Sequence, residues 1–331
     1  MAGIAPAEAA GAPDAEAYDA WVAAGMHGTM AYMARNAESR RDARAWFPAA
    51  KSVLVCGYSY GGDRPAPAPG RGRLARYAVR EDYHPLLKAK MAALLDWFRA
   101  LAPGASGLAF CDTSPLLERS LARRAGLGWQ GKNTMLIAPS LGSYFLLAGL
   151  ALDVELPGDE PEADHCGTCR RCLEACPTGA FPRERVLDAS RCVSYFTIEN
   201  KGPVPEEFRA GVGDWVFGCD ACQEACPWNR FERPGRAAGA PREALSVPLD
   251  ELAQLDDESF RRRFRDLPVS RAKRRGLQRN VLLAMGNSGD ARYRAALERF
   301  AAGADEVLAE QARWSLLRLS GAEGRAKMSS K

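Results

Sequence analysis

The sequence lacks several features that would assign it to a class of protein at once. Its longest apolar run covers only residues 144–152, whereas a membrane-spanning helix needs roughly 18 residues. It has three histidines, too few to suggest a histidine-rich zinc or copper centre. Its formal net charge of +4 is small for 331 residues. Residues 1–12 lack the basic segment of a secretory signal, so we expect a cytoplasmic protein that binds no membrane.

Cysteine, in contrast, is abundant, and ten cysteines in a cytoplasmic chain favour metal binding over disulfides. Eight of the ten are predicted to be iron–sulfur ligands, and seven of these fall into two closely spaced runs. These eight are Cys166, Cys169, Cys172, Cys176, Cys192, Cys219, Cys222 and Cys226. The first four follow the bacterial ferredoxin pattern C-x2-C-x2-C-x3-C-P, and the last three follow C-x2-C-x3-C-P. This spacing predicts two [4Fe–4S] clusters.

In two-cluster ferredoxins the last cysteine of each run ligates the other cluster. We therefore expect cluster 1 to be bound by Cys166, Cys169, Cys172 and Cys226. We expect cluster 2 to be bound by Cys176, Cys192, Cys219 and Cys222. Cys192 is assigned because Val216 occupies the first ligand position of the second run. Structural zinc is the alternative, but zinc sites favour paired C-x2-C motifs over three cysteines in one loop.

Residues 50–156 alternate between strand-like and helical patterns, which predicts an α/β domain. The expected strands cover residues 52–58, 108–111, 134–138 and 143–152, with a helix over 85–101 and a loop over 61–72. Ser114-Pro115 predicts the start of a second helix that ends at Ala125, before Gly126. The other two cysteines, Cys56 and Cys111, lie in apolar runs and are predicted to be buried core thiols.

The region 160–232 shows little periodicity, so bound clusters must organise it. A linker over Pro234–Pro241 precedes helices predicted at 277–286, 292–302 and 307–319, which resemble a HEAT-type repeat. We thus expect three domains. They are an α/β catalytic domain over 1–157, a ferredoxin-type two-cluster domain over 158–235 and a helical HEAT-like domain over 236–331.

Asp112 follows the strand predicted over 108–111, and ligands of α/β domains bind beyond the ends of strands. From position alone, an ordinary aspartate at a helix start is the favoured interpretation. The stretch 111–134, CDTSPLLERSLARRAGLGWQGKNT, nevertheless resembles the signature of the epoxyqueuosine reductase family. The cysteine runs, Arg191–Asn200, Gly57–Tyr60, residues 77–84 and the basic helical tail resemble the same family.

The resemblance implies an enzyme that reduces epoxyqueuosine to queuosine at the wobble position of tRNA with a GUN anticodon. It implies two [4Fe–4S] clusters and base-off cobalamin in a domain like that of reductive dehalogenases. Asp112 would donate a proton as cob(I)alamin attacks the epoxide. The implied cobalamin-binding residues are Arg35, Asp112, Ser194, Asn200, Gly218, Cys219 and Asp220. Lys132-Asn133 could line the same pocket or form a plain turn. A flavodoxin- or ferredoxin-type donor and a monomeric enzyme are also implied.

Basic residues concentrate in 261–279, where nine positive charges face Asp266 alone. Such a cluster can neutralise phosphates, although a solvated helical face is an equal alternative. The resemblance favours a grip on the anticodon stem-loop. The expected tRNA contacts are Arg119, Arg123, Arg271, Lys273, Arg274, Arg275 and Arg279.

One departure from the family lies at the N-terminus, where Met1 stands almost inside the strand expected around Gly3-Ile4-Ala5-Pro6. Family members usually begin with a further helix and strand. Two alternative functions also remain open. A reductive-dehalogenase-like reductase of a small molecule is disfavoured by the basic tail and the lack of a twin-arginine leader. A multidomain ferredoxin that only carries electrons would not need the long segment around Asp112.

Overall fold

The computed structural model describes residues 1–8, 12–62, 68–232, 235, 241–244 and 246–329. They form two compact units, each built from three stretches of the chain. Unit 1 comprises Met1–Gly62, Asp82–Ser190 and Ala221–Gly239, and unit 2 comprises Asp63–Glu81, Arg191–Asp220 and Ala240–Lys331. The boundaries of the three predicted domains stay a prediction, and most of the linker expected over 234–241 lies outside the described residues. No helix in the described part of the chain is long and apolar enough to cross a bilayer.

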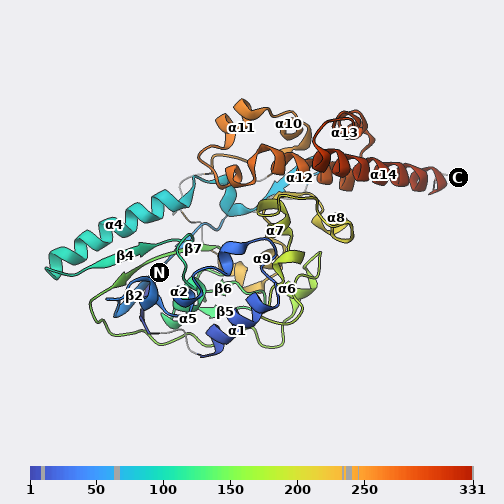
Figure 1. Ribbon diagram of the computed structural model, residues 1–331. Coiled ribbons are helices and arrows are strands. Elements are labelled where there is room, and N and C mark those ends of the chain that lie inside the picture. The colour runs from blue at the N-terminus through green and yellow to red at the C-terminus, as the bar shows by residue number, and fades with distance from the viewer. Residues whose placement is uncertain (9–11, 63–67, 233–234, 236–240, 245, 330–331) are drawn as a thin grey trace. The chain divides into compact units, whose positions relative to one another are not determined.

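Unit 1 is built on a four-stranded sheet with the strand order β1-β2-β7-β4 (Figure 1). The strands are β1 (Ala2–Pro6), β2 (Ser52–Ser59), β7 (Phe145–Leu152) and β4 (Gly107–Phe110). All three pairings are antiparallel. Three predicted strands are thereby confirmed, but the one over 134–138 shrinks to β6 (Leu136–Ile137), which pairs with β5 (Trp129–Gln130). The rule of a ligand crevice at parallel strand ends does not apply to an antiparallel sheet.

Two helices of unit 1 position the segment around Asp112. Helix α4 (Tyr83–Leu101) buries Leu87, Met91 and Leu95 at a four-residue spacing and packs on β4 and β7. Helix α5 (Glu118–Arg124) packs on β1, β2 and β7. The remaining helices of this unit are α1 (Ala12–Ala23), α2 (Ala37–Arg41), α3 (Ala43–Trp46), α6 (Arg171–Glu174) and α9 (Ala221–Glu224).

The predicted start of α5 is wrong, although its end is right. Residues Ser114 and Pro115 lie in a series of tight turns, and the helix begins at Glu118. The backbone N–H of Leu116, for example, donates to the carbonyl of Ser114 at 2.8 Å. Gly126 then ends the helix with a positive φ of 70°, a conformation that favours glycine.

Unit 2 contains a three-stranded sheet and a group of helices around a buried central helix. The sheet has the order β8-β3-β9, with β8 at Trp215–Phe217, β3 at Arg71–Leu74 and β9 at Ser246–Pro248. The helices are α7 (Val193–Ile198), α8 (Glu206–Val212), α10 (Leu249–Ala253), α11 (Asp257–Phe264), α12 (Lys273–Ser288), α13 (Arg294–Ala301) and α14 (Glu306–Ser329). Ten consecutive residues of α12, Leu277–Gly286, are buried, and α14 packs on both α12 and α13.

The sequence patterns located the three C-terminal helices but not this small sheet. Strand β3 occupies the end of the region predicted as a loop over 61–72, so that prediction is wrong from Arg71 onward. It pairs with β8 in parallel and with β9 in antiparallel orientation. Whether α12, α13 and α14 form a HEAT-type repeat stays a prediction.

Candidate functional site

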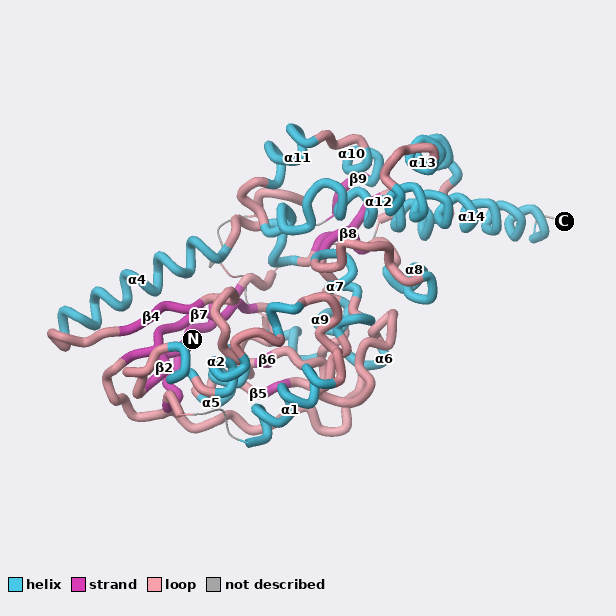
Figure 2. Tube along the Cα trace, in the orientation of Figure 1, coloured by secondary structure: helices cyan, strands magenta, loops and turns pink. Residues whose placement is uncertain are grey.

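The two cysteine runs lie on short helical turns joined by loops, as Figure 2 shows for α6 and α9. Gly167 adopts a positive φ of 50°, and the N–H of Cys169 donates to the carbonyl of Cys166 at 3.1 Å, so the first loop turns tightly. Helix α6 carries Cys172 and packs against α9, which carries Cys222. Unit 1 thus places Cys172 of the first run and Cys222 of the second run on two helices that pack together.

The four thiols predicted to bind cluster 1 all belong to unit 1 and lie close together. Burial raises the pKa of Cys172 to about 11, and the nearby thiols of Cys226, Cys166 and Cys169 raise it further. Burial also raises the pKa of Cys226, with Cys166 and Cys169 again contributing. Cys226, which follows Cys172 by 54 positions in the sequence, therefore lies close to the cysteines of the first run. Among the described residues, no three His, Cys, Asp or Glu side chains converge closely enough to hold a single metal ion.

The four thiols predicted to bind cluster 2 are divided between the units. Cys176 and Cys222 belong to unit 1, whereas Cys192 and Cys219 belong to unit 2. The backbone N–H of Ala180 donates a hydrogen bond to the Cys176 sulfur at 3.3 Å. All ten cysteines lie in the described part of the chain, and none of them forms a disulfide. The ligand set of cluster 2 stays a prediction.

Asp112 lies just beyond β4, as predicted, and its backbone has a positive φ of 54°. Its carboxylate oxygen Oδ2 is 3.0 Å from Nε2 of His84, while Nδ1 of the same ring is 2.6 Å from Oδ1 of Asp82. Asp82 also caps α4 by accepting the N–H of His84 at 3.0 Å. Tyr83 stacks on the imidazole with the ring centroids 4.2 Å apart. The histidine is therefore held between two carboxylates.

This arrangement favours the protonated form of His84. Burial disfavours the charged imidazole, but hydrogen bonds to Asp112 and Asp82 outweigh it and raise the pKa of His84 to about 9. At neutral pH, His84 is therefore protonated beside Asp112. The Asp112 side chain keeps 46% of its surface exposed, so the pair can reach a bound molecule. Sequence reasoning assigned no role to His84, although it is one of only three histidines in the chain.

A second carboxyl group lies behind Asp112, at the first residue of α5. Glu118 accepts a hydrogen bond from the backbone N–H of Asp112, and its Oε1 is sealed from solvent without a partner among the described residues. Burial first, and then the charge of Asp112, raise the pKa of Glu118 to about 8. Although the residue as a whole is only half-buried, its carboxyl group is thus protonated at neutral pH. Glu118 was also missed from the sequence.

Several minor predictions can be judged from burial. Cys56 and Cys111 are 8% and 0% exposed, which confirms them as core thiols, and burial raises the pKa of Cys111 to about 12. Lys132 and Asn133 do not form a solvated turn, because they are 6% and 2% exposed. Lys132 pairs with Glu184 at 3.1 Å, and both residues are held inside unit 1.

The residues implied for cobalamin are distributed over both units. Arg35 is exposed in unit 1, whereas Ser194, Asn200, Gly218 and Asp220 belong to unit 2. Gly218 has a positive φ of 67°, and its N–H donates to the Thr197 hydroxyl at 3.0 Å. The Asp220 side chain is turned inward, where its Oδ2 accepts the N–H of Arg76 at 2.8 Å. These contacts hold the 218–220 backbone rigidly, so this segment can offer main-chain groups to a cofactor but not the Asp220 carboxylate.

The basic residues of 261–279 have more partners than the sequence indicated. Arg263 pairs with Glu243 at 2.6 Å, Arg271 with Glu199 at 2.9 Å and Arg274 with Asp257 at 2.7 Å. Arg275 pairs with Asp305. The surface around this stretch is therefore less positive than a count of nine cations against one aspartate indicates, because acidic residues from other parts of unit 2 lie beside four of the arginines.

Arg279 does not fit the predicted tRNA contact. Its side chain is 2% exposed, and its guanidinium donates to the backbone carbonyls of Phe196, Asn200 and Gly202. Burial lowers the pKa of Arg279 to about 10, which is still high enough to keep it charged. Arg279 thus holds the loop after α7 instead of facing solvent.

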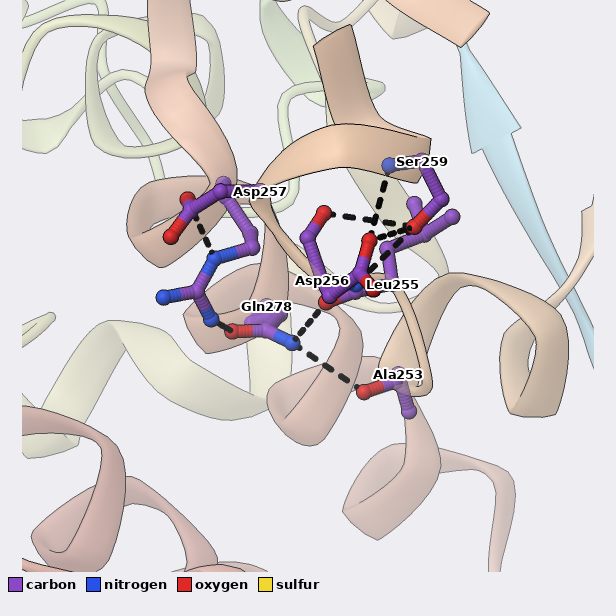
Figure 3. Close-up of polar contacts among 7 residues, drawn as sticks. Ala253, Leu255, Asp256, Asp257, Ser259 and Gln278 are labelled. Carbon is purple, nitrogen blue, oxygen red and sulfur yellow. Dashed lines mark hydrogen bonds and ion pairs between the residues drawn. The ribbon is translucent and has the colours of Figure 1, made fainter. Parts of the chain in front are cut away.

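Polar contacts tie the first turns of α12 to the segment between α10 and α11 (Figure 3). The amide of Gln278 donates to the carbonyls of Ala253 and Leu255 at 3.1 and 3.0 Å, and its oxygen accepts from Arg274 at 2.7 Å. Asp256 caps α11 by accepting the N–H of Ser259 at 2.7 Å. Arg274 is therefore tied into these contacts, whereas Lys273 is exposed.

In unit 1, the two arginines predicted to contact tRNA lie on α5, one turn apart. Arg123 pairs with Asp14 at 2.8 Å, whereas Arg119 is exposed and reaches the carbonyl of Thr134 at 3.4 Å. Arg119 is therefore the more accessible of the two.

Comparisons with known proteins agree with this architecture. Residues 165–229 match the 4Fe-4S double cluster binding domain family, and residues 40–113 match the family described as Epoxyqueuosine reductase QueG, DUF1730. The chain is 41% identical over 295 residues to epoxyqueuosine reductase of Gloeobacter violaceus, covering 87% of this chain and 92% of that protein.

Two solved structures are also similar along most of the chain. One is an epoxyqueuosine reductase with a tRNA-Tyr epoxyqueuosine-modified stem loop, with a TM-score of 0.88 and 28% identity over 96% of this chain and 86% of that one. The other is the Bacillus subtilis epoxyqueuosine reductase with its catalytic aspartate loop swung out of the active site, with a TM-score of 0.86 and 27% identity over the same shares. From these matches, the chain belongs to the epoxyqueuosine reductase family.

Proposed function

We propose that this chain reduces epoxyqueuosine to queuosine in tRNA. Its membership of the family carries the proposal, and the relative solved with an epoxyqueuosine-modified stem loop supports tRNA as the substrate. Removal of the epoxide oxygen as water consumes two electrons and two protons. A two-cluster domain can deliver the electrons one at a time. The His84–Asp112 pair can deliver one of the two protons, and solvent would supply the other.

Asp112 is the proposed proton donor to the opening epoxide oxygen. Its carboxylate is partly exposed, and the protonated imidazole of His84 hydrogen-bonds to it at 3.0 Å. The pair holds one proton, which rests on His84 at neutral pH because the pKa of His84 is about 9. Asp112 can donate this proton to the epoxide oxygen once His84 has passed it across their hydrogen bond. The donor is therefore the pair, with Asp112 facing the substrate and His84 storing the proton.

Two cofactors are proposed. The four grouped thiols of Cys166, Cys169, Cys172 and Cys226 fit one [4Fe–4S] cluster, and the remaining four ligand cysteines would hold the second. Cobalamin enters by family resemblance, with the 218–220 backbone, Ser194, Asn200 and Arg35 as its proposed contacts. When bound, it would supply a reduced cobalt that is strongly nucleophilic toward an epoxide carbon.

The tRNA surface is proposed to include Arg119, Arg271, Lys273 and Arg275, with Arg123 and Arg274 as weaker contributors. Exposed ion pairs such as Arg271–Glu199 contribute little to stability, so these arginines can exchange a carboxylate for a phosphate. A flavodoxin- or ferredoxin-type protein as electron donor, a monomeric state and a cytoplasmic location complete the proposal.

Asp112→Asn tests this function most directly. The amide keeps the shape of the side chain and tolerates a positive φ, but it cannot donate an acidic proton. We expect the variant to keep its iron content and to bind the tRNA stem loop, while single-turnover formation of queuosine falls at least about 100-fold. Nucleoside analysis by mass spectrometry measures the product. Full activity in the variant would remove Asp112 from the proposal.

A further inference from the structure

We propose that Trp129 raises the reduction potential of cluster 1 by donating its indole N–H to the Cys166 sulfur. Nε1 of Trp129 lies 3.4 Å from Sγ of Cys166, within the range of N–H···S hydrogen bonds. The inference rests on the proposed ligand set of cluster 1, in which Cys166 is the first ligand. It concerns the electronic tuning of the cluster, which the family matches do not address.

The fold holds this indole firmly in place. Trp129 is 2% exposed and begins β5, where it pairs with Ile137 of β6. At Gly128, the preceding residue, an added Cβ would come within 2.1 Å of the Ile137 carbonyl oxygen. Glycine therefore allows the two strands to approach closely, and this approach fixes the start of β5 next to the cysteine loop.

Two other aromatic rings pack against the Trp129 indole. The Trp129 ring meets His165 and Trp228 edge-on, each with centroids 4.9 Å apart. The ring of Trp228 lies next to that of Phe231, with the two centroids 5.7 Å apart. The indole N–H of Trp228 points elsewhere, because it donates to the backbone carbonyl of His165 at 3.4 Å. The two tryptophans are thus neighbours, but of their two indole N–H groups only that of Trp129 donates to a ligand sulfur.

The direction of the effect follows from charge. Adding an electron to a [4Fe–4S] cluster places more negative charge on its sulfurs, so a hydrogen-bond donor at a ligand sulfur stabilises the reduced form more than the oxidised form. Trp129 itself is 2% exposed, so solvent has little access to compete with its indole N–H for the sulfur. Cluster 1 should therefore accept an electron from a weaker reductant than it would without Trp129.

Trp129→Phe and Trp228→Phe form a matched pair for the test. Both keep an aromatic ring, and only the first removes the N–H directed at Cys166. In anaerobically purified protein with both clusters loaded, we would follow each cluster by electron paramagnetic resonance during a redox titration. We expect Trp129→Phe to shift the midpoint potential of one cluster to a more negative value and leave the other unchanged. Trp228→Phe should leave both potentials unchanged.

Two results would overturn the proposal: an unchanged potential in Trp129→Phe, or equal shifts in the two variants, which would indicate packing. If Trp129→Phe does not take up cluster 1, the unsubstituted protein labelled with 15N-indole tryptophan provides the test. Pulsed electron paramagnetic resonance of the reduced cluster should detect a 15N coupling that persists in Trp228→Phe, and its absence would refute the hydrogen bond. Neither readout depends on tRNA turnover, so failure of the proposed function is a separate outcome.

Discussion

Replacing Asp112 with asparagine should weaken the hold of His84 on its proton. The pKa of His84 rises from an ordinary value of 6.5 to about 9, a difference worth about 3 kcal/mol. Burial opposes this rise, and the hydrogen bonds to Asp112 and Asp82 produce it, with Asp112 the larger of the two contributions. Without the Asp112 charge, Asp82 alone must offset burial. We therefore expect the pKa of His84 to fall by about 1–3.

Nuclear magnetic resonance of the imidazole rings measures this directly. The chain has only three histidines, so the ring signals are few, and His84→Gln assigns the signal in question. A His84 pKa that Asp112→Asn leaves unchanged would refute the proposed proton store.

The same pair predicts how stability and turnover depend on pH. A histidine whose pKa is raised by folding contributes stability that is fully present below pH 6.5 and is lost as the pH rises through about 9. Turnover limited by the proton of His84 should decline over the upper part of this range, because the store empties. Single-turnover rates of His84→Gln, which has no imidazole to titrate, should not show this decline at alkaline pH.

Three further predictions concern other parts of the chain. Cys226→Ala should lose about half of the roughly eight irons, four of them with cluster 1, as measured by iron analysis, whereas Cys56→Ala should keep them all. Lys273→Glu should weaken binding of the tRNA stem loop and reduce the slope of log affinity against log salt by about 1, while Arg299→Glu, the same charge change on α13, should not. Glu118→Gln should be more stable to denaturant than the unsubstituted protein above about pH 8, by roughly 1–3 kcal/mol. At that pH the unsubstituted protein must bury a charged Glu118 carboxylate, whereas the glutamine amide stays neutral. The advantage should vanish below about pH 4.5, where stability linked to the raised pKa of Glu118 is fully present; an advantage that is equal at both pH values would argue against a protonated Glu118.

The grouping of the first three candidate iron–sulfur ligands could be predicted from the sequence because ligand spacing is a local property. Three thiols separated by two residues must share one tight loop, and only the fourth ligand required knowledge of two-cluster ferredoxins. The structure brings that fourth thiol, Cys226, to the first run. The sequence could not predict which strands pair with each other, because strand pairing depends on residues that are far apart in the chain. Periodicity indicates that residues 52–58 and 143–152 are strands, but it does not say that they pair antiparallel over eight residues.

The basic stretch shows how counting charges along a sequence can mislead. Nine cations appeared to face one aspartate, yet in the folded chain Glu199, Glu243, Asp257 and Asp305, all outside the stretch, pair with four of them. Arg279 departs furthest from expectation, because its charge is satisfied by backbone carbonyls in the interior of unit 2. Only the folded chain distinguishes a cation that holds a loop from one that can meet a phosphate.

The backbone of Asp112 gives the strongest reason to regard its position as functional. A non-glycine residue with a φ of 54° costs of order 1 kcal/mol or more unless its surroundings favour it. Here, the N–H of Asp112 is held by Glu118 and its carboxylate by His84, so two separate elements, α5 and α4, fix the same residue from opposite ends. Glycine would adopt this backbone at lower cost. An aspartate that is kept in an unfavourable conformation, beside a stored proton and a second protonated carboxyl group, is better explained by acid chemistry than by the start of a helix that begins only at Glu118.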